Sequence, residues 1–271
     1  MTEIKQAFFA SFIAFSLCFI VCSQSADTGK SRNRNRNFIG STESDLTLSD
    51  VEKNFTWKYY NYEQLTNFVG NASTKYPKLC HVYSIGRSVK NRDLWVMKIT
   101  KDVNKHVLGK PMFKYVANIH GNEALGRQYL IYLAEYLLSS YGKDKRVTEI
   151  VDSTDIHLLF SINPDGFETA TEGDCTGYNI TSSRRNANGV DLNRDFPDQF
   201  EHLSKNKFDI KDLVHGRQPE TVAVMTWIVS NPFVLSASLH GGSVVASYPF
   251  DDSAGHVESG TPSLSPDDTV F

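Results

Sequence analysis

The chain has 271 residues, of which 40% are hydrophobic and 12% aromatic, so it can bury the core of one large domain or two small ones. Its formal net charge of −3 gives no general attraction to nucleic acid, and the sequence contains no long basic stripe interleaved with aromatic residues. The composition therefore excludes a disordered chain and disfavours a nucleic-acid partner.

The amino-terminal residues 1–23 are predicted to form a secretory signal. Lys5 precedes an apolar run from Ala7 to Cys22, and small and polar residues follow, with cleavage expected near Ser23. The run is short for a membrane span of about 20 residues, and an uncleaved anchor is the alternative. The mature chain as given is expected to have no membrane span and to be secreted or held in the secretory pathway, while a longer form could carry a membrane anchor.

Residues 24–53 are predicted to be a flexible polar spacer that precedes a folded domain at 54–271. N-glycosylation sequons, which fit a secreted chain, begin at Asn54, Asn71 and Asn179. Two cysteines remain after the signal. Cys80 and Cys175 either pair in an oxidising compartment or stay unpaired, with Cys80 in the core.

Strand and helix signals alternate along the domain. Asn61 can cap a helix that runs to about Lys75, and the β-like segments 81–85 and 94–99 are joined as in a hairpin. The later predicted elements are a buried strand at 113–119, a helix from Glu123 to near Gly142, a strand at 156–160, a turn at 163–166, a helix from Pro219 that ends before Pro232, and a strand that ends at His240. This alternation predicts an α/β fold with a central mixed, mostly parallel sheet flanked by helices.

Histidine and carboxylate side chains follow two of the predicted strands. His120 and Glu123 are three residues apart at a strand-to-helix turn, where an imidazole nitrogen and a carboxylate oxygen can converge. His240 ends another strand and precedes two glycines. Catalytic zinc sites usually have three protein ligands, and ligands of open α/β sheets gather beyond the carboxyl ends of the strands. The three residues are therefore predicted to bind one Zn²⁺.

The segment 184–197 is rich in guanidinium and amide donors, the groups that bind a carboxylate in a bidentate manner. On composition alone it is a solvated basic loop. Beside a zinc site, one of its arginines can hold a substrate carboxylate while another stabilises the oxyanion formed on a polarised carbonyl.

Four ordered motifs resemble the zinc metallocarboxypeptidases. They are His-Gly-Asn-Glu at 120–123, Asn-Pro-Asp-Gly at 163–166, Asp-Leu-Asn-Arg-Asp-Phe-Pro at 191–197, and Leu-His-Gly-Gly with Ser-Tyr-Pro-Phe-Asp within 239–251. The resemblance runs from about Phe55 to the last residue. It is strongest to the regulatory branch with carboxypeptidases D, E, M and N, in particular the insect carboxypeptidase D type. It implies a mixed sheet flanked by helices and release of C-terminal Lys or Arg from peptides and proteins in the secretory pathway, as in peptide or prohormone processing.

The resemblance also implies roles for individual residues. It implies zinc binding by His120, Glu123 and His240, a grip on the substrate's terminal carboxylate by Asn193 and Arg194, and polarisation of the scissile carbonyl by Arg184. Arg185 is the adjacent alternative to Arg184. Asp251 matches the acidic residue of the specificity pocket, with Asp252 as its rival, and a buried carboxylate there would select substrates with basic C-termini.

The family's general-base glutamate lies well downstream of the third zinc ligand, and this chain has no counterpart to it. Glu258 is the sole glutamate after His240, and its surroundings predict a loop. The sequence is interpreted either as a fragment of an active enzyme or as a short isoform that binds zinc and basic C-terminal peptides without turnover. A zinc amidohydrolase of acylated amino acids is a further alternative, whereas the absence of His-Glu-x-x-His disfavours a thermolysin-like protease.

Overall fold

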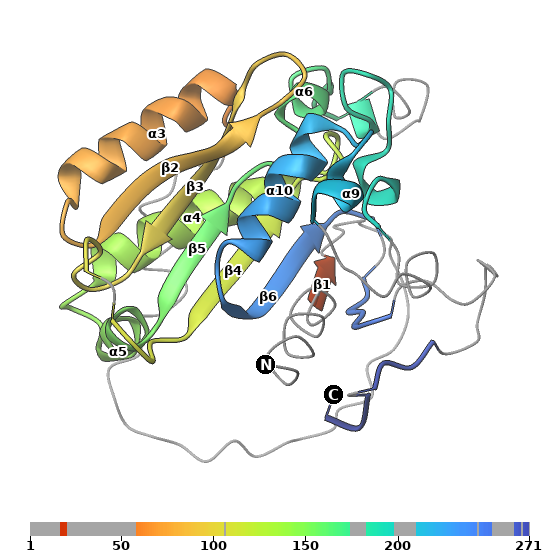
Figure 1. The fold of residues 1–271 in the computed structure, drawn as a ribbon. Helices are drawn as coiled ribbons and strands as arrows, with labels where there is room; N and C mark the ends of the chain where they lie inside the picture. The colour runs from red at the N-terminus through yellow and green to blue at the C-terminus, as the bar shows by residue number, and fades with distance from the viewer. Residues whose placement is uncertain are drawn as a thin grey trace, which may run out of the picture.

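The computed structural model describes residues 17–20, 58–105, 107–173, 183–197, 210–242, 244–250, 263–266 and 268–270. Its centre is a six-stranded sheet with the strand order β1-β6-β4-β5-β3-β2 (Figure 1). The strands are β1 (Leu17–Ile20), β2 (Cys80–Arg87), β3 (Asp93–Ile99), β4 (Met112–Ala117), β5 (Asp155–Leu159) and β6 (Phe233–His240). Strand β3 is antiparallel to β2 and β5, and the other pairs are parallel, so the predicted mixed sheet is confirmed.

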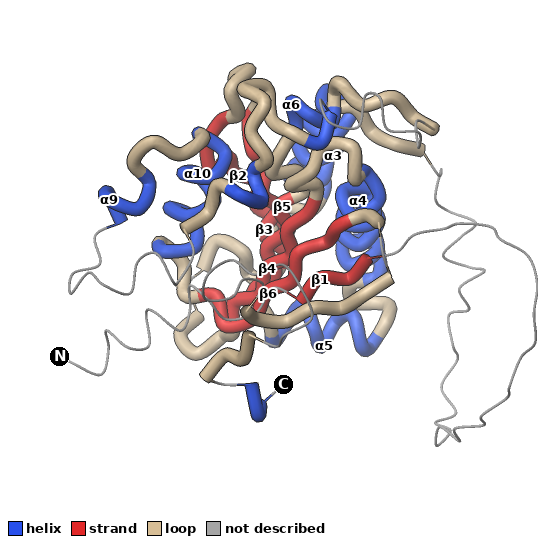
Figure 2. Tube along the Cα trace, turned by 90° about the vertical axis from the view of Figure 1, so that its right-hand side faces the viewer, coloured by secondary structure: helices blue, strands red, loops and turns tan. Residues whose placement is uncertain are grey.

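Helices cover both faces of this sheet, as the prediction required (Figure 2). One face packs against α3 (Tyr62–Lys75), α4 (Ala124–Ser140) and α5 (Lys145–Ser153), and the other against α10 (Pro219–Val229), beside which lies α9 (Ile210–Val214). The short helices are α6 (Pro164–Phe167), η1 (Leu192–Arg194) and η2 (Asp268–Val270). Among the described residues, none of the helices has the length and apolar character needed to cross a bilayer.

Alternation of side chains along β3 divides the core into two clusters. Met97 and Ile99 are fully buried against the layer that contains α4 and α5. Leu94 and Val96 point to the opposite face and belong to the cluster that contains Trp227 of α10. Each such side chain contributes roughly 1.5–3 kcal/mol when it is fully buried, so both helix layers are held firmly to the sheet.

Local sequence signals set the ends of the predicted helices. The Asn61 side chain accepts a hydrogen bond from the Gln64 N–H at 2.8 Å, and the Gln64 side chain accepts one from the Asn61 N–H at 3.1 Å, which is a complete capping box. Gly142 follows the end of α4 with a φ of 77°, the left-handed conformation that favours glycine after a helix. These two helices and the hairpin of β2 and β3 agree with the predictions.

The structure also adds elements that the sequence analysis did not predict. Helix α5 buries Val147 and Val151 within nine residues, which is too short a pattern to stand out. The segment predicted as a turn at 163–166 forms the one-turn helix α6, in which Asn163 accepts a hydrogen bond from the Gly166 N–H at 2.8 Å. The end of one strand also differs from the prediction: β4 ends at Ala117, whereas the predicted strand ran to residue 119.

Strand β1 falls inside the predicted secretory signal. Its backbone runs parallel to β6, with Leu17 opposite Ala237. The rest of the signal and the spacer 24–53 lie outside the described residues, so signal cleavage and the domain boundaries remain predictions.

Cys80 is a free thiol buried in the core, and burial raises its pKa to about 12. This placement agrees with the unpaired alternative, while Cys175 lies outside the described residues. Asn71 is exposed on α3, whereas Asn54 and Asn179 also lie outside the described residues. Glycosylation at the three sequons remains a prediction.

A row of polar side chains crosses the sheet on the face that α10 covers. Its members are successive cross-strand neighbours: His81, Lys98, His157, Lys114 and Ser236. Lys114 is only 8% exposed, and its ammonium lies 5.4 Å from the centre of the Phe233 ring. Burial lowers the pKa of Lys114 to about 8, because the charged form loses hydration there.

Replacing Lys114 by methionine is expected to stabilise the protein at pH 7 by about 1–3 kcal/mol, because the buried charge is removed while the aliphatic chain stays. The folded-state pKa, about 8, lies below the ordinary value of 10.5. The unfolded chain therefore binds more protons between these values, and the stability of the parent rises with pH through this window. The gain from the substitution should accordingly shrink between pH 8 and 10.5.

Urea unfolding of both proteins at pH 7 and pH 10 measures this difference. Lys98→Met is the matched control, because Lys98 forms an ion pair with Asp155 at 2.9 Å and its loss should destabilise the protein. A Lys114→Met protein that is less stable than the parent at pH 7 would contradict the expectation.

Candidate metal centre

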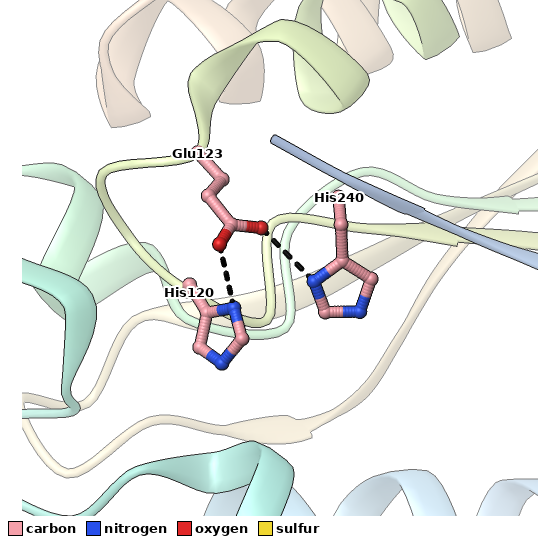
Figure 3. Close-up of side chains that lie close together, drawn as sticks. All are labelled: His120, Glu123 and His240. Carbon is pink, nitrogen blue, oxygen red and sulfur yellow. Dashed lines mark hydrogen bonds and ion pairs between the residues drawn. The ribbon is translucent and has the colours of Figure 1, made fainter. Parts of the chain in front are cut away.

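Two adjacent parallel strands bring the candidate metal ligands together. Ala117, the last residue of β4, lies opposite Leu239 of β6. His120 and Glu123 lie in the segment that connects β4 to α4, and His240 is the last residue of β6. The three side chains therefore meet at the carboxyl ends of the two strands (Figure 3), where ligands of open α/β sheets collect.

Both carboxylate oxygens of Glu123 face an imidazole nitrogen. His120 Nδ1 lies 2.8 Å from Oε1, and His240 Nδ1 lies 2.9 Å from Oε2. The potential ligand atoms of the three residues lie within 4.8 Å of one another. His120 is buried, while Glu123 and His240 are partly exposed, so the centre lies partly inside the protein.

Asp191 fixes the orientation of the His120 ring. Its Oδ1 lies 3.1 Å from His120 Nε2 and can accept the Nε2–H, which leaves Nδ1, the nitrogen that faces Glu123, as the ligand atom for a metal. With the proton on Nε2, the Nδ1 lone pair and the Glu123 oxygen can both face the same cation. Two imidazole nitrogens and a carboxylate are a donor set that zinc takes in catalytic sites, so the residues fit this metal.

The Glu123 carboxylate is kept ionised. Burial acts to raise its pKa, but hydrogen bonds with His120 and His240, the charge of His120 and the N–H of Gly241 outweigh it and hold the pKa at about 2. The Gly241 N–H donates to Oε2 at 2.8 Å. The Glu123 carboxylate is therefore negatively charged at neutral pH.

The structure distinguishes the two adjacent arginines. Arg184 contacts Glu123 Oε1 through Nη1 and Asp191 Oδ2 through Nε, each at 3.2 Å. Arg185 is exposed, and its Nη1 donates to the carbonyl of Gly189 at 2.8 Å. Arg184 therefore lies at the candidate metal centre, and this geometry supports its predicted role over that of Arg185.

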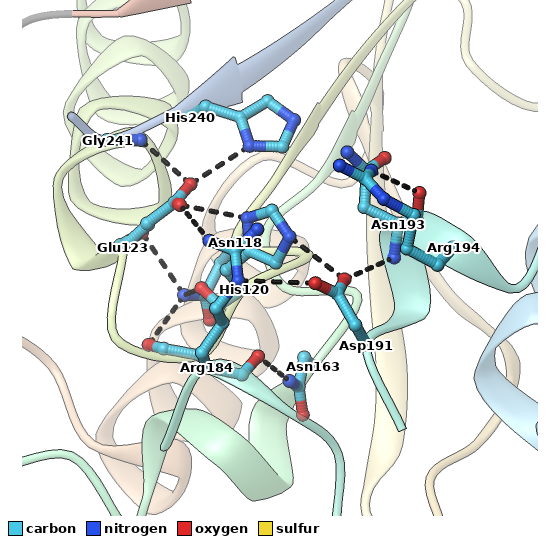
Figure 4. Close-up of polar contacts among 11 residues, drawn as sticks. Asn118, His120, Glu123, Asn163, Arg184, Asp191, Asn193, Arg194, His240 and Gly241 are labelled. Atoms are coloured by element: carbon cyan, nitrogen blue, oxygen red, sulfur yellow. Dashed lines mark hydrogen bonds and ion pairs between the residues drawn. The ribbon is translucent and has the colours of Figure 1, made fainter. Parts of the chain in front are cut away.

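The two residues predicted to hold a substrate carboxylate lie on η1, directly after Asp191 (Figure 4). The Asn193 N–H donates to Asp191 Oδ1 at 2.9 Å, which joins this short helix to the same carboxylate that orients His120. Arg194 is exposed, and its Nη1 donates to the Asn193 carbonyl at 3.0 Å. Its guanidinium is thus available beside the centre.

The acidic candidates Asp251 and Asp252 and the glutamate Glu258 lie outside the described residues. Their predicted roles stay predictions.

Sequence reasoning assigned no role to Asp191 or to Asn163. Asp191 opens one of the four motifs, and a carboxylate two residues before an Asn-Arg pair was the signal that could have identified it. Asn163 donates from Nδ2 to the carbonyl of Arg184 at 3.1 Å, which holds the arginine's backbone against α6. Its position in Asn-Pro-Asp-Gly predicted only a turn.

The chain is similar in sequence to known proteins over most of its length. A family model described as zinc carboxypeptidase matches residues 65–271. The chain is 48% identical to carboxypeptidase D of Drosophila melanogaster over 196 residues, which cover 72% of this chain and 13% of that protein. It is 45% identical to carboxypeptidase M of Mus musculus over 218 residues, which cover 79% of this chain and 46% of that protein. The chain thus spans less than half the length of these two relatives.

Solved structures of zinc carboxypeptidases and related proteins share this fold, and two of those with TM-scores above 0.5 serve as examples. Thrombin activatable fibrinolysis inhibitor aligns with a TM-score of 0.56 and 21% identity, over 69% of this chain and 48% of that one. The carboxypeptidase A from Helicoverpa armigera aligns with a TM-score of 0.54 and 20% identity, over 72% of this chain and 51% of that one. At these identities the likeness establishes the shared fold.

Proposed function

The chain belongs to the zinc carboxypeptidase family, and from this membership we propose that it acts as a zinc-dependent metallocarboxypeptidase that removes the C-terminal residue of peptides and proteins. The observation that carries the proposal is the convergence of His120, Glu123 and His240 on one point beside Arg184. The curated relatives named carboxypeptidase D, M and E support placing the activity in the regulatory branch.

His120, Glu123 and His240 would hold one zinc ion. When bound, zinc supplies a Lewis acid for the substrate carbonyl and lowers the pKa of bound water. Arg184 would stabilise the negative charge that develops on the carbonyl oxygen, and the position of its guanidinium 3.2 Å from the proposed ligand Glu123 supports this role. Asp191 would hold the His120 ring in its orientation through the contact with Nε2.

The proposed substrate ends in Lys or Arg. Asn193 and Arg194 would hold its terminal carboxylate, since a guanidinium can bind a carboxylate through two parallel hydrogen bonds. Asp251 would face its cationic side chain. The predicted signal at 1–23, the sequons at Asn54, Asn71 and Asn179, and a domain over 54–271 support action in the secretory pathway or outside the cell, on peptides such as prohormones.

The base that accepts the proton of water is not assigned to a described residue. Glu123 and Asp191, the carboxylates that contact the described site, each hold a histidine, so neither is available for this step. This observation supports a second candidate function, in which the chain binds zinc and basic C-terminal peptides without cleaving them.

Hydrolysis of a dansylated dipeptide ending in arginine, compared with dipeptides ending in alanine and phenylalanine, tests the proposal on the 271-residue chain. Chelator-sensitive release of arginine is expected from the metallocarboxypeptidase. Stoichiometric zinc and peptide binding without product would favour the binding function instead. Cleavage of N-acyl amino acids with no action on the dipeptides would favour a zinc amidohydrolase.

Substitution of Arg184 by alanine is expected to lower kcat about 10²–10³-fold, as the loss of one oxyanion-stabilising donor does in other enzymes. Arg185→Ala is the matched control, because the Arg185 side chain points to Gly189 and should leave kcat within a few-fold of the parent. Steady-state kinetics on the arginine-ended dipeptide measure both. A larger loss in Arg185→Ala than in Arg184→Ala would reverse the assignment.

A further inference from the structure

A single buried side chain ties together the backbone of the turn that carries His120 and Glu123. Asn118 is fully buried, and the two hydrogens on its Nδ2 are shared among the carbonyls of His120 and Gly121, at 2.9 Å each, and of Glu123, at 3.2 Å. All three carbonyls belong to the four-residue turn that supplies two of the three candidate ligands. Asn118 lies beside His120 and Glu123 (Figure 4). Its three hydrogen bonds go to backbone carbonyls and not to the side-chain atoms that would bind a metal.

The Asn118 amide is itself fixed from the neighbouring strand. Ser161, two residues past the end of β5, donates from Oγ to Asn118 Oδ1 at 2.7 Å and is 4% exposed. The Asn118 carbonyl accepts the Asn163 N–H at 3.0 Å. The three carbonyl acceptors of the turn determine which way the side-chain amide points, because the flipped amide would direct its oxygen at them. The turn is therefore tied to the end of β5 through Asn118.

The backbone at this position restricts which residues can do this. Asn118 has a φ of 58°, in the left-handed region that glycine, asparagine and aspartate adopt most readily. Glycine would accept the conformation but offers no donor. Aspartate would place acceptor oxygens against three buried carbonyls. Asparagine meets both requirements, the conformation and the donation.

We propose that Asn118, oriented by Ser161, is the positioning residue that sets the zinc affinity of the centre. It does so by holding the backbone of the turn in the arrangement that aims His120 and Glu123 at one point. The inference rests on the metal centre of the proposed function and adds to it a residue that acts through the backbone rather than as a ligand. Partners that orient metal ligands typically contribute 10–100-fold to metal affinity, and a similar loss is expected here.

Zinc binding by the metal-free chain, measured in competition with a chromogenic chelator, tests this without reference to catalysis. Asn118→Gly keeps the left-handed backbone and removes the three donations, so its zinc affinity should fall about 10–100-fold. Asn91→Gly is the matched control: Asn91 has a φ of 62° in the hairpin between β2 and β3, and its side chain accepts from Arg87. Zinc affinity in this control should stay within about twofold of the parent, because it makes no contact with the turn.

Ser161→Ala provides a second variant in case Asn118→Gly does not fold. It leaves the backbone unchanged and removes one hydrogen bond to the amide, so a smaller fall of about 2–10-fold in the same direction is expected. The visible spectrum of the cobalt-substituted proteins should change in both variants and not in Asn91→Gly. If Asn118→Gly folds and binds zinc as tightly as the parent, the inference is overturned. If Asn118→Gly does not fold, unchanged zinc affinity in Ser161→Ala overturns it. A parent chain that binds no zinc overturns the metal centre itself.

Discussion

Replacing Glu123 by glutamine is expected to reduce zinc affinity by more than the roughly 100-fold that the loss of an orienting partner costs, and to abolish peptide hydrolysis with it. The Glu123 carboxylate bridges two imidazoles, with Oε1 facing His120 and Oε2 facing His240. Glutamine keeps the size of the side chain but is neutral. It also turns an NH₂ towards one of the two imidazoles, where a metal-ligating atom is needed.

Metal analysis of the dialysed variant and competition with a chelator measure this loss. Glu149→Gln is a matched control on the exposed surface of α5, and it should retain one zinc ion per chain at the affinity of the parent. Zinc bound equally well by Glu123→Gln would show that the carboxylate is not a ligand.

Substitution of Gly121 by alanine is expected to destabilise the protein by about 3 kcal/mol or more and to remove zinc binding. A Cβ at this position would lie within 3.0 Å of three backbone atoms, which belong to Gly166, Phe167 and Ser183. Backbone cannot move aside as a flexible side chain can. The turn that carries His120 would therefore separate from α6 and from the segment before Arg184.

Gly70→Ala is the matched control for this substitution. Gly70 lies within α3, and a Cβ there meets no atom within 4 Å. Alanine should stabilise the helix by roughly 0.5–1 kcal/mol, because glycine costs more conformational entropy on folding. Thermal unfolding of both variants gives the comparison, and a Gly121→Ala protein as stable as the parent would show that the close backbone packing is not required.

Much of the candidate site could be predicted from the sequence because its ligands end strands. The apolar runs before His120 and His240 identified two buried strands, and the carboxyl ends of parallel strands meet at one edge. The capped helix after Asn61 and the helix after Glu123 were predictable for a similar reason, since their end signals are local.

The rest of the site depends on contacts between distant segments, which no local pattern encodes. Asp191 meets His120 from 71 residues away, and Ser161 meets Asn118 from 43 residues away. Ser161 has no distinctive neighbourhood of its own, and the motif that Asp191 opens does not show which side chain its carboxylate meets. Lys114 likewise interrupts the apolar pattern of β4, and only the assembled sheet shows that its charge is buried.

The pairing of β4 with β6 has a further consequence for the unfolded chain. Glu123 and His240 are 117 residues apart in sequence, yet both are proposed to hold the same ion. Zinc would then act as a reversible cross-link that closes a long loop, much as a disulfide does but under the control of metal supply. Zinc at about 1,000 times its dissociation constant would add about 4 kcal/mol to the free energy of unfolding. The supply of zinc would thereby determine the fraction of chains that stay folded as well as the fraction that have a catalytic centre.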